Sequence, residues 1–505
     1  MILLVVVGVL VAALVAVAVY DVVQSRHAVL RNYPVIGHLR YVLESFGPET
    51  RQYLVTDNDE ERPFSRDQRR WIYSAAKNTD TSFGFGTDNH IEDIRDYLII
   101  DHAAFPLGLG AARPDPGFAV PAAKVLGARR GRAGAFRPSL VNISGMSFGS
   151  LSGAAVESMN RGAALVGCWH NTGEGGISAH HLHGADLVWQ VGTGYFGCRD
   201  EHGRFSLDRL VEALDGHPQV RAVEIKLSQG AKPGLGGLLP GTKVTPEIAR
   251  IRGIPVGVDC ASPPAHTAFD SVDSLLELVE TIADRTGRPV GLKSAVGETA
   301  FWEHLADRMG ATDRGVDFIT IDGGEGGTGA GPLVFTDHVA LPFRQAFARA
   351  YGCFAERGAQ HDVVWIGSAR LGLPENALAA LALGCDQVSV GREVMMATGC
   401  IQAQRCHTGR CPTGVATQSR WLQHGLDPDA KSTRVAGYLA QLRFELVRLA
   451  RACGQLHPAL VTLDQLEVLD GSHGAQRLGA LMGYRPGWGE LDAADAEALR
   501  QLMAG

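Results

Sequence analysis

The chain has 505 residues, of which 45% are hydrophobic and 20% charged, and its formal net charge is −7. It contains no run of five or six like charges, so nothing in it predicts a nucleic-acid-binding surface. Nine cysteines are too few for a disulfide-stabilised scaffold of this length. The 62 glycines suit a fold with many tight turns and with backbone that closely approaches a ligand.

The N-terminus predicts a membrane anchor. Residues 2–20 contain no charge and no proline, and as a helix they would cross roughly 28 Å, about the hydrocarbon core of a bilayer. Arg26, Arg31 and Arg40 follow, and positive charge on this side places it in the cytoplasm. We therefore expect a single-pass protein of the cell membrane with a cytoplasmic catalytic domain. The alternative is a cleaved signal peptide, because Ala16-Val17-Ala18 has the small-x-small form, although no basic residue precedes the apolar run.

The remaining chain predicts one large α/β domain with extensions at both ends. Residues 21–137 are expected to form a partly helical N-terminal collar and linker, and residues 426–505 a C-terminal helical extension. Over residues 138–425, short β-type runs alternate with amphipathic helical stretches such as 271–286 and 375–383. About eight such units favour a closed (β/α)8 TIM barrel of parallel strands. The candidate strands are residues 140–144, 165–171, 222–227, 255–258, 290–293, 318–321, 363–366 and 387–390.

Glycine and polar residues follow most of these strands at the same end. Examples are the segments 172–176, 229–237, 322–331 and 367–370. The carboxyl ends of barrel strands meet on one face, and the active sites of barrel enzymes lie on that face. The pattern therefore predicts an active site there.

Three cysteines fall in one short segment, Cys400-x5-Cys406-x4-Cys411-Pro412. Three soft thiolates at this spacing suit iron–sulfur or zinc. Zinc would need a fourth ligand, and His407 is too close to Cys406 to complete an unstrained tetrahedron. A cluster of three irons needs only three thiolates, and a proline after the last cysteine is typical of iron–sulfur loops. The spacing favours an iron–sulfur cluster in a reducing compartment, with zinc and a purely structural role left open.

Several glycine-containing loops and one lysine predict an anionic cofactor. Residues 322–331 are rich in glycine and follow a strand, but no Gly-Lys-Ser/Thr completes a Walker loop. Residues 367–370 and Gly391-Arg392 follow the last two strands, where barrels commonly bind phosphate. Lys293 ends an apolar strand and needs an anionic partner, which a reduced flavin would supply.

Two other patterns predict local structure. Gly192-Thr-Gly-Tyr-Phe-Gly197 matches the dinucleotide-binding expression, but no helix start follows it, so we interpret it as a loop. His180, His181 and His183 are too close in the chain to converge easily on one ion, and we expect them to form local hydrogen bonds.

Residues from about 138 to 425 resemble the FMN-binding synthase domain of glutamate synthase. The N-terminal anchor, with Arg31-x-Tyr-Pro and Arg40-Tyr, resembles the stand-alone, membrane-anchored branch that is called glutamate synthase large subunit-like. The barrel motifs that carry the resemblance are Gly145-Met-Ser-Phe-Gly-Ser150, Asn171-Thr-Gly-Glu-Gly-Gly176, Gln229-Gly-Ala-Lys-Pro-Gly234, Leu239-Pro-Gly241, Ser262-Pro-Pro264, Gly326-Gly-Thr-Gly-Ala330 and residues 400–418.

The resemblance implies FMN at the C-terminal face of the barrel and a 3Fe–4S cluster on Cys400, Cys406 and Cys411. It implies that electrons from an external donor, a ferredoxin-like protein or a reductase subunit, pass through the cluster to FMN. Reduced FMN would then give a hydride to 2-iminoglutarate, formed from 2-oxoglutarate and ammonia, and yield L-glutamate.

The resemblance also assigns site residues. By motif, Glu174, Lys232 and Arg252 would face the 2-oxo acid, with the cations pairing with its carboxylates. The residues that would contact FMN are Met146, Ser147, Gln229, Lys293, Gly326, Gly327, Ser368 and Arg392.

Four departures from the family pattern bear on substrate. Leu238 replaces a glutamine that helps to bind 2-oxoglutarate, Leu235 replaces a glutamate, and Gly323-Gly324-Glu325 replaces Gly-His-Asp. The glutaminase domain is missing, so ammonia would come free or from a partner. The apolar replacements predict weak use of 2-oxoglutarate and a preference for a bulkier or less polar oxo acid. The alternative function is a membrane-tethered flavin and iron–sulfur electron carrier that reduces another acceptor or a protein partner.

Overall fold

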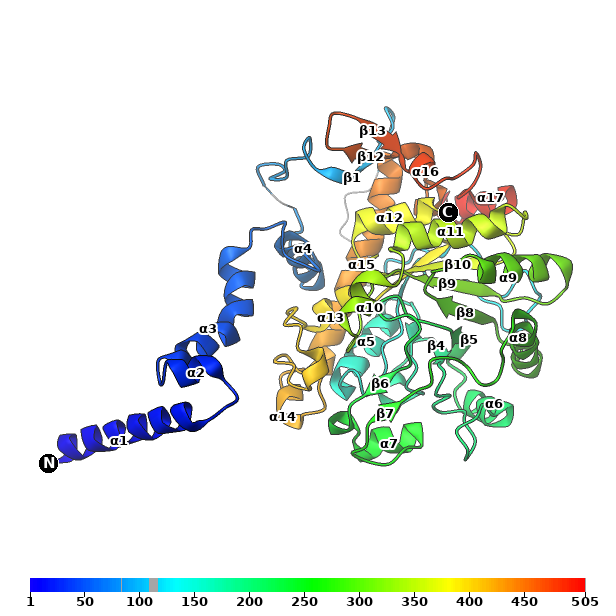
Figure 1. Ribbon diagram of the computed structural model, residues 1–505. Coiled ribbons are helices and arrows are strands. Elements are labelled where there is room, and N and C mark those ends of the chain that lie inside the picture. The colour runs from blue at the N-terminus through cyan, green and yellow to red at the C-terminus, as the bar shows by residue number, and fades with distance from the viewer. Residues whose placement is uncertain (83, 109–116, 505) are drawn as a thin grey trace. The chain divides into compact units, whose positions relative to one another are not determined.

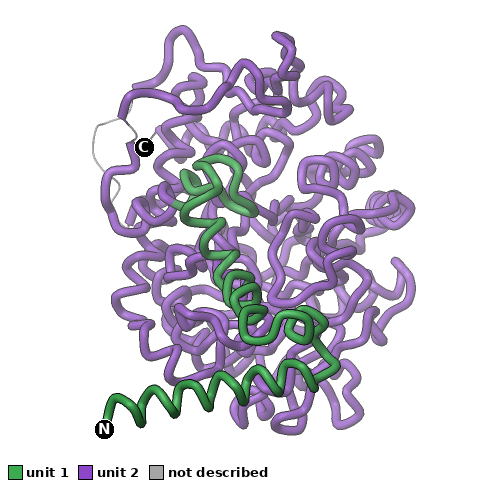
Figure 2. The backbone as a smooth tube through the Cα atoms, turned by 60° about the vertical axis from the view of Figure 1, so that its left-hand side comes forward, with its two compact units in different colours: residues 1–69 green, residues 70–505 purple. Residues whose placement is uncertain are grey.

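The computed structural model describes residues 1–82, 84–108 and 117–504 (Figure 1). The chain divides into two compact units, Met1–Arg69 and Arg70–Gly505 (Figure 2). The larger unit contains the predicted barrel, and the smaller one contains the predicted anchor.

The larger unit is built on a closed barrel of parallel strands, which confirms the predicted fold class. Around the barrel the order is β2-β3-β4-β5-β8-β9-β10-β11, and β11 pairs with β2 to close it. The strands are β2 (Val141–Ile143), β3 (His170–Asn171), β4 (Leu187–Val191), β5 (Val220–Lys226), β8 (Val290–Ser294), β9 (Phe318–Asp322), β10 (Val364–Ser368) and β11 (Gln387–Val390).

Helices cover the outside of the barrel, and the strands are therefore buried on both faces. Helix α8 (Val272–Thr286) is capped at its N-terminus by Ser271, whose side chain accepts the backbone N–H of Ser274. At its C-terminus it is followed by Gly287 in the left-handed conformation. The bounds of this helix and of α12 (Pro374–Ala382) agree within one residue with the predicted helices 271–286 and 375–383. The other helices of this part of the chain include α5 (Gly153–Leu165), α6 (Leu207–Asp215), α7 (Pro246–Arg252), α9 (Ala300–Ala311), α11 (Phe343–Ala355) and α13 (Arg392–Thr398). The short helix α10 (Leu333–His338), in the segment after β9, buries none of its residues.

The structure corrects two of the predicted strands. Residues 255–258 form a turn, with Gly257 at φ 73°, and the short strands β6 (Leu238–Leu239) and β7 (Cys260–Ala261) on either side pair antiparallel outside the barrel. Residues 165–169 belong to the end of α5 and the following turn, so only His170–Asn171 of the predicted 165–171 is a strand. The barrel strand that the sequence interpretation missed is β4.

The N- and C-terminal parts of the larger unit complete its core. The long helix α15 (Pro428–Ala452) packs along α5 (Figure 1). Its buried Arg443 donates hydrogen bonds to the carbonyl oxygens of Val166 and Phe118. The short helix α14 (Arg420–Gln423) precedes α15. A small sheet joins β1 (Arg95–Ile100) to β12 (Leu466–Asp470) and β13 (Ala475–Arg477), and α16 (Leu478–Leu481) and α17 (Ala493–Ala504) follow it.

The smaller unit consists of helices α1 (Ile2–Val23), α2 (Ala28–Asn32) and α3 (Gly37–Thr50), a π-helical turn (Arg51–Val55) and the start of α4 (Arg66–Ala76). The apolar stretch of helix α1 has a mean hydropathy of 3.3 and is not buried, whereas Asp21 near the end of the helix is buried. By length and composition the helix could cross a membrane, and a signal sequence would pass the same test.

Candidate functional site

The predicted site residues lie at the carboxyl ends of the barrel strands. The segment with Met146 and Ser147 follows β2, Glu174 follows β3, and Gln229 and Lys232 follow β5. Lys293, Ser368 and Arg392 stand at the ends of β8, β10 and β11, and Gly326 and Gly327 belong to the loop after β9. The parallel barrel places all these ends on one face.

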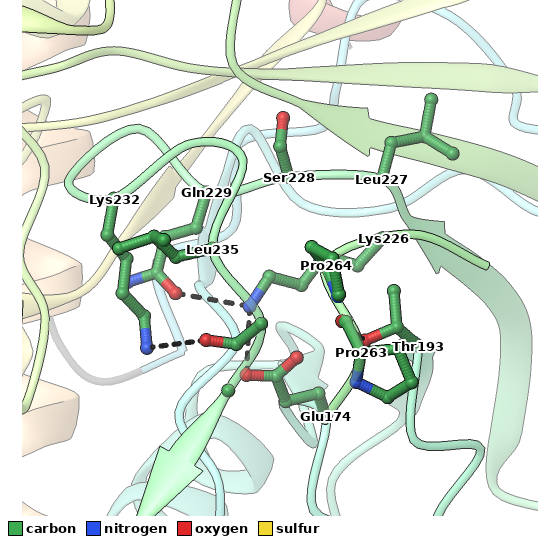
Figure 3. A pocket seen from close by; sticks show the side chains of 12 residues that line it. Glu174, Thr193, Lys226, Leu227, Ser228, Gln229, Lys232, Leu235, Pro263 and Pro264 are labelled. Carbon is green, nitrogen blue, oxygen red and sulfur yellow. Dashed lines mark hydrogen bonds and ion pairs between the residues drawn. The ribbon is translucent and has the colours of Figure 1, made fainter. Parts of the chain in front are cut away.

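A lysine that the sequence interpretation missed organises a pocket on this face. Lys226, the last residue of β5, places its Nζ 3.1 Å from Oε1 of Glu174 and 3.1 Å from Oε1 of Gln229 (Figure 3). Nζ of Lys232 donates to the carbonyl oxygen of Gly236 at 3.4 Å. The remaining lining residues are Thr193, Leu227, Ser228, Leu235, Gly237, Pro263 and Pro264.

The charges in this pocket act on one another. Burial raises the pKa of Glu174, but the neighbouring Lys226 and, further off, Lys232 and Arg252 lower it more, so its pKa lies below the usual value. Burial lowers the pKa of Lys232, and Glu174 only partly offsets this. The pocket therefore holds an ionised carboxylate beside two amines, one of which loses its proton more easily than an exposed lysine.

Arg252 lies outside the described lining of the pocket. Its Nη2 donates to the carbonyl oxygen of Phe148 at 3.2 Å, its Nη1 lies 3.7 Å from Sγ of Cys260, and its guanidinium stacks 5.1 Å from the centre of the Phe196 ring. The structure thus brings Glu174 and Lys232 together, while Arg252 acts on Glu174 through its charge and lies outside the described lining.

Lys293 has a carboxylate of the chain, Asp322, as an anionic partner, whereas the sequence interpretation assigned this role to a reduced flavin. Its Nζ lies 3.6 Å from Oδ2 of Asp322, and the same oxygen accepts the backbone N–H of Gly230 at 2.9 Å. Burial lowers the pKa of Lys293, but Asp322 and Glu224 outweigh burial and raise it. Lys293 therefore stays an ammonium inside the barrel.

Glu224 is a buried carboxylate of β5 that the sequence interpretation also missed. It accepts hydrogen bonds from Nδ2 of Asn171 at 2.8 Å, Nε2 of Gln190 at 2.7 Å and Oγ1 of Thr320 at 2.7 Å. Three hydrogen bonds offset the cost of burying a charge. The sequence signal for this residue was a glutamate between buried apolar residues of a strand. A protein core rarely contains a charged side chain unless that side chain has partners.

The loops after β5, β9 and β11 meet. Nε2 of Gln229 donates to the carbonyl oxygen of Gly327 at 3.0 Å, and Arg392 donates to the carbonyl oxygen of Glu325. A Cβ at Gly327 would lie 2.7 Å from Cδ of Arg392, so this close approach requires glycine.

The predicted residues Ser147, after β2, and Ser368, the last residue of β10, each contact a serine of the segment after β2. Oγ of Ser368 lies 3.4 Å from Oγ of Ser144, and Oγ of Ser147 donates to Oγ of Ser150 at 3.0 Å. A Cβ at Gly173 would lie 2.5 Å from the backbone N of Ser147, so the loop after β3 presses on the loop that carries Met146 and Ser147.

Backbone carbonyl groups of the cysteine segment accept hydrogen bonds from two other segments of the larger unit. Tyr73 of α4 donates to the carbonyl oxygen of Cys400 at 2.8 Å, and Nζ of Lys243 donates to that of Cys406 at 2.7 Å. Cys411 is buried, whereas Cys400 and Cys406 are half-buried. Across the described residues, no three His, Cys, Asp or Glu side chains form a group that could hold a metal. The iron–sulfur cluster therefore stays a prediction of the spacing.

The family departures have separate structural settings. Leu235 lines the pocket, whereas Leu238 belongs to β6, is 54% exposed and is not part of the described lining. Glu325 accepts the N–H of Phe343, the first residue of α11, at 2.8 and 3.1 Å and so caps that helix.

The glycine motif is a loop, as expected, whereas the histidines make one local hydrogen bond, at His181, and otherwise contact residues distant in the chain. Residues 192–197 form a loop after β4, in which the Tyr195 hydroxyl accepts the backbone N–H of Thr267. His181 Nδ1 contacts Oγ of Ser178 at 2.9 Å, and His183 lies 3.7 Å from Glu157.

A closed parallel barrel with paired, buried acids and amines at the carboxyl ends of its strands defines the class as a (β/α)8 enzyme. Comparison with known proteins narrows this class. Residues 137–456 match the family model described as a conserved region in glutamate synthase. The chain therefore belongs to the glutamate synthase family and is a glutamate synthase-like oxidoreductase.

Two relatives in sequence agree with this assignment. The chain is 36% identical over 471 residues to the glutamate synthase large subunit-like protein YerD of Bacillus subtilis, covering 86% of this chain and 88% of that protein. It is 37% identical over 317 residues to the archaeal glutamate synthase (NADPH) of Methanocaldococcus jannaschii, covering 62% of this chain and 59% of that longer protein. The flavin-binding domain of baker's yeast flavocytochrome b2 aligns over 80% of this chain and 79% of its own, at 13% identity and a TM-score of 0.42.

Proposed function

We propose that the chain is an FMN-dependent oxidoreductase that reductively aminates a 2-oxo acid and converts 2-oxoglutarate and ammonia into L-glutamate. The observation that carries this proposal is the pocket in which Glu174, Lys226, Gln229 and Lys232 meet. Lys226 and Lys232 suit the carboxylates of a 2-oxo acid, and the ionised Glu174 suits an N–H donor such as ammonium or an imine.

The residues of the neighbouring loops fit FMN. Arg392 is half-buried. Burial lowers its pKa, Glu393 raises it and the charge of Arg370 lowers it again, so that an anion bound between the two guanidinium groups would stabilise both. Ala369 and Arg370 have φ of 131° and 49°, a strained backbone of the kind found at ligand sites. FMN bound there would supply the hydride, and Lys293 would supply a positive charge to the isoalloxazine ring.

We propose an iron–sulfur cluster on Cys400, Cys406 and Cys411 from their spacing, and its 3Fe–4S type and an electron donor, a ferredoxin-like protein or a reductase subunit, from the resemblance to glutamate synthase. The test is the iron and acid-labile sulfide content of the purified full-length chain. We expect iron and sulfide in the wild type and their loss in Cys406→Ser, with flavin still bound, because one of three protein bonds to the cluster is removed. Zinc without iron in the wild type would contradict the assignment.

The flavin half of the proposal is tested by denaturing the purified full-length chain and identifying the released cofactor. We expect FMN, and we expect Arg392→Met to weaken its binding because a cation is removed from the anion site. Release of FAD, or of no flavin, contradicts this assignment.

The reaction is tested by reducing the bound flavin with light and following its reoxidation. We expect 2-oxoglutarate and ammonium together, but neither alone, to reoxidise the flavin and to yield L-glutamate, identified by mass spectrometry. Lys232→Met should slow this step at subsaturating 2-oxoglutarate, and Lys77→Met, at an exposed position outside the pocket, is the matched control. A flavin that stays reduced with both substrates, while other electron acceptors oxidise it, would instead favour the electron-carrier function.

We further propose that α1 anchors the chain in the cell membrane as a single span, with the barrel in the cytoplasm. Its hydropathy and exposure support the span, and Arg26, Arg31 and Arg40 after it support the orientation.

A further inference from the structure

Helix α3 presents an exposed apolar stripe. Leu39, Val42, Leu43 and Phe46 repeat at i, i+3, i+4 and i+7, so their side chains share one face of the helix. They are 62%, 50%, 73% and 63% exposed. A helix of a water-soluble protein usually turns such a stripe toward a core, and here the stripe is left open.

The opposite side of α3 is polar and makes its own contacts. Nε of Arg40 lies 2.9 Å from Oε1 of Glu44, one turn further along the helix. The Tyr41 hydroxyl lies 3.5 Å from Nδ1 of His27, and their rings meet edge to face. The helix is therefore amphipathic, with its polar side occupied and its apolar side uncovered.

A joint within the smaller unit fixes α3 to the end of α1. The buried Asp21 carboxylate, near the end of α1, accepts the backbone N–H of Val35 at 2.8 Å and contacts Nε2 of His38 at 2.9 Å. Leu30 of α2 packs on Gly37, where a Cβ would lie 3.1 Å from its Cδ2. The chain changes direction between α1 and α3, so α3 does not prolong α1 (Figure 2). An amphipathic helix is thus held at the end of the candidate membrane span.

We propose that α3 lies in the membrane–water interface, with Leu39, Val42, Leu43 and Phe46 among the lipid acyl chains. An amphipathic helix that follows a membrane span and is fixed to its end is already at the depth where such helices bind. Arg31, exposed between the two helices, suits an anionic headgroup. This inference rests on the proposed anchor α1 and is independent of the reaction proposed for the barrel.

The test places a photoreactive p-benzoylphenylalanine at Leu43 in the full-length chain, reconstituted in phosphatidylcholine and phosphatidylglycerol vesicles. The matched control places it at Ser45, an exposed position off the stripe, and a probe at Leu39 guards against a misfolded variant. After irradiation, mass spectrometry should find about tenfold more lipid adduct at 43 and 39 than at 45. Adducts from 43 and 39 to the barrel or to a second copy, or equal lipid adducts at all positions, would overturn the inference.

Vesicle flotation after carbonate extraction separates this failure from failure of the anchor. A chain that floats but gives no lipid adduct at 43 or 39 keeps the anchor and loses the interfacial helix. A chain that stays at the bottom of the gradient loses both.

Discussion

At the residue scale, Lys226 connects side chains that the sequence predicted separately. Glu174 and Gln229 belong to loops after different strands, and each contacts the Lys226 ammonium at 3.1 Å. The sequence placed Glu174 and Gln229 by motif, but it did not indicate that a strand-end lysine would join them. Such contacts depend on which strands become neighbours in the barrel, and local patterns do not encode this.

The two leucines that depart from the family pattern are expected to differ in effect. Leu235→Gln should raise kcat/KM for 2-oxoglutarate about fivefold, since one added hydrogen bond contributes about 1 kcal/mol. Leu238→Gln is the matched control, because this side chain is 54% exposed and outside the described lining of the pocket. Steady-state kinetics on both variants make the comparison. Equal effects of the two substitutions would show that Leu235 does not face the substrate.

His170 should make the fold sensitive to acid. It is fully buried, neither ring nitrogen has a hydrogen-bond partner among the described residues, and burial lowers its pKa to about 3. Below pH ~6.5 the unfolded chain therefore binds a proton that the folded chain does not, and the free energy of unfolding falls by about 1.4 kcal/mol per pH unit.

His170→Leu should accordingly flatten the fall in stability between pH 6.5 and 5 while leaving the stability at pH 7.5 nearly unchanged. Urea unfolding at several pH values measures this. The buried His457, whose pKa burial lowers to about 4, should keep part of the dependence in the variant. An acid dependence identical to that of the wild type would mean that His170 does not contribute to it.

At the scale of elements, the strand–helix alternation was predicted well and individual strands less so. Strand β4 was not predicted, because a run of five residues, Leu187–Val191, does not by itself distinguish a strand from a buried segment of another kind. Residues 255–258 have β-type composition, but Pro255 and Gly257 place them in a turn outside the barrel. Composition describes what a segment prefers, and only the closed sheet decides which short runs become strands.

Glu325 should stabilise the N-terminus of helix α11. This carboxylate accepts the N–H of Phe343 at 2.8 Å and takes the place of a cap, because Pro342 at the N-cap position has no side-chain acceptor. Glu325→Ala should lower the free energy of unfolding by about 1 kcal/mol, and Glu325→Gln by less, since an amide oxygen still accepts. Hydrogen exchange should be faster for the first amides of α11 in Glu325→Ala. Unchanged exchange there would mean that the cap contributes nothing.

At the scale of the whole molecule, the chain joins a barrel whose fold was predictable to an apolar helix whose membrane insertion and orientation are proposed. The barrel follows from an alternating pattern that repeats along the chain, so errors in single strands did not change the fold class. The candidate pocket was predictable only as a set of residues on one face. The ion pair and hydrogen bonds within the pocket, and the position of Arg252 outside its lining, depend on side-chain packing between residues far apart in the sequence.

The proposed orientation predicts where the C-terminus lies. A reporter that is active only in the cytoplasm, fused after Gly505, should be active, since Arg26, Arg31 and Arg40 retain their side of the membrane. A reporter that needs export, fused at the same position, is the complementary measurement. Activity of the exported reporter alone would contradict the orientation.

The bonds of Glu224 bear on how the barrel can be assembled. Its partners Asn171 and Gln190 come from β3 and β4, whereas Thr320 comes from β9, almost a hundred residues later in the chain than Glu224. A fragment that ended after β5 would have to bury this charge with part of its partners or leave it in water, and either choice opposes a stable half-barrel. We therefore expect the two halves of the barrel to fold as one cooperative unit. Gene fusions or duplications that exchange half-barrels in this family would have to carry over a matching hydroxyl on the incoming half.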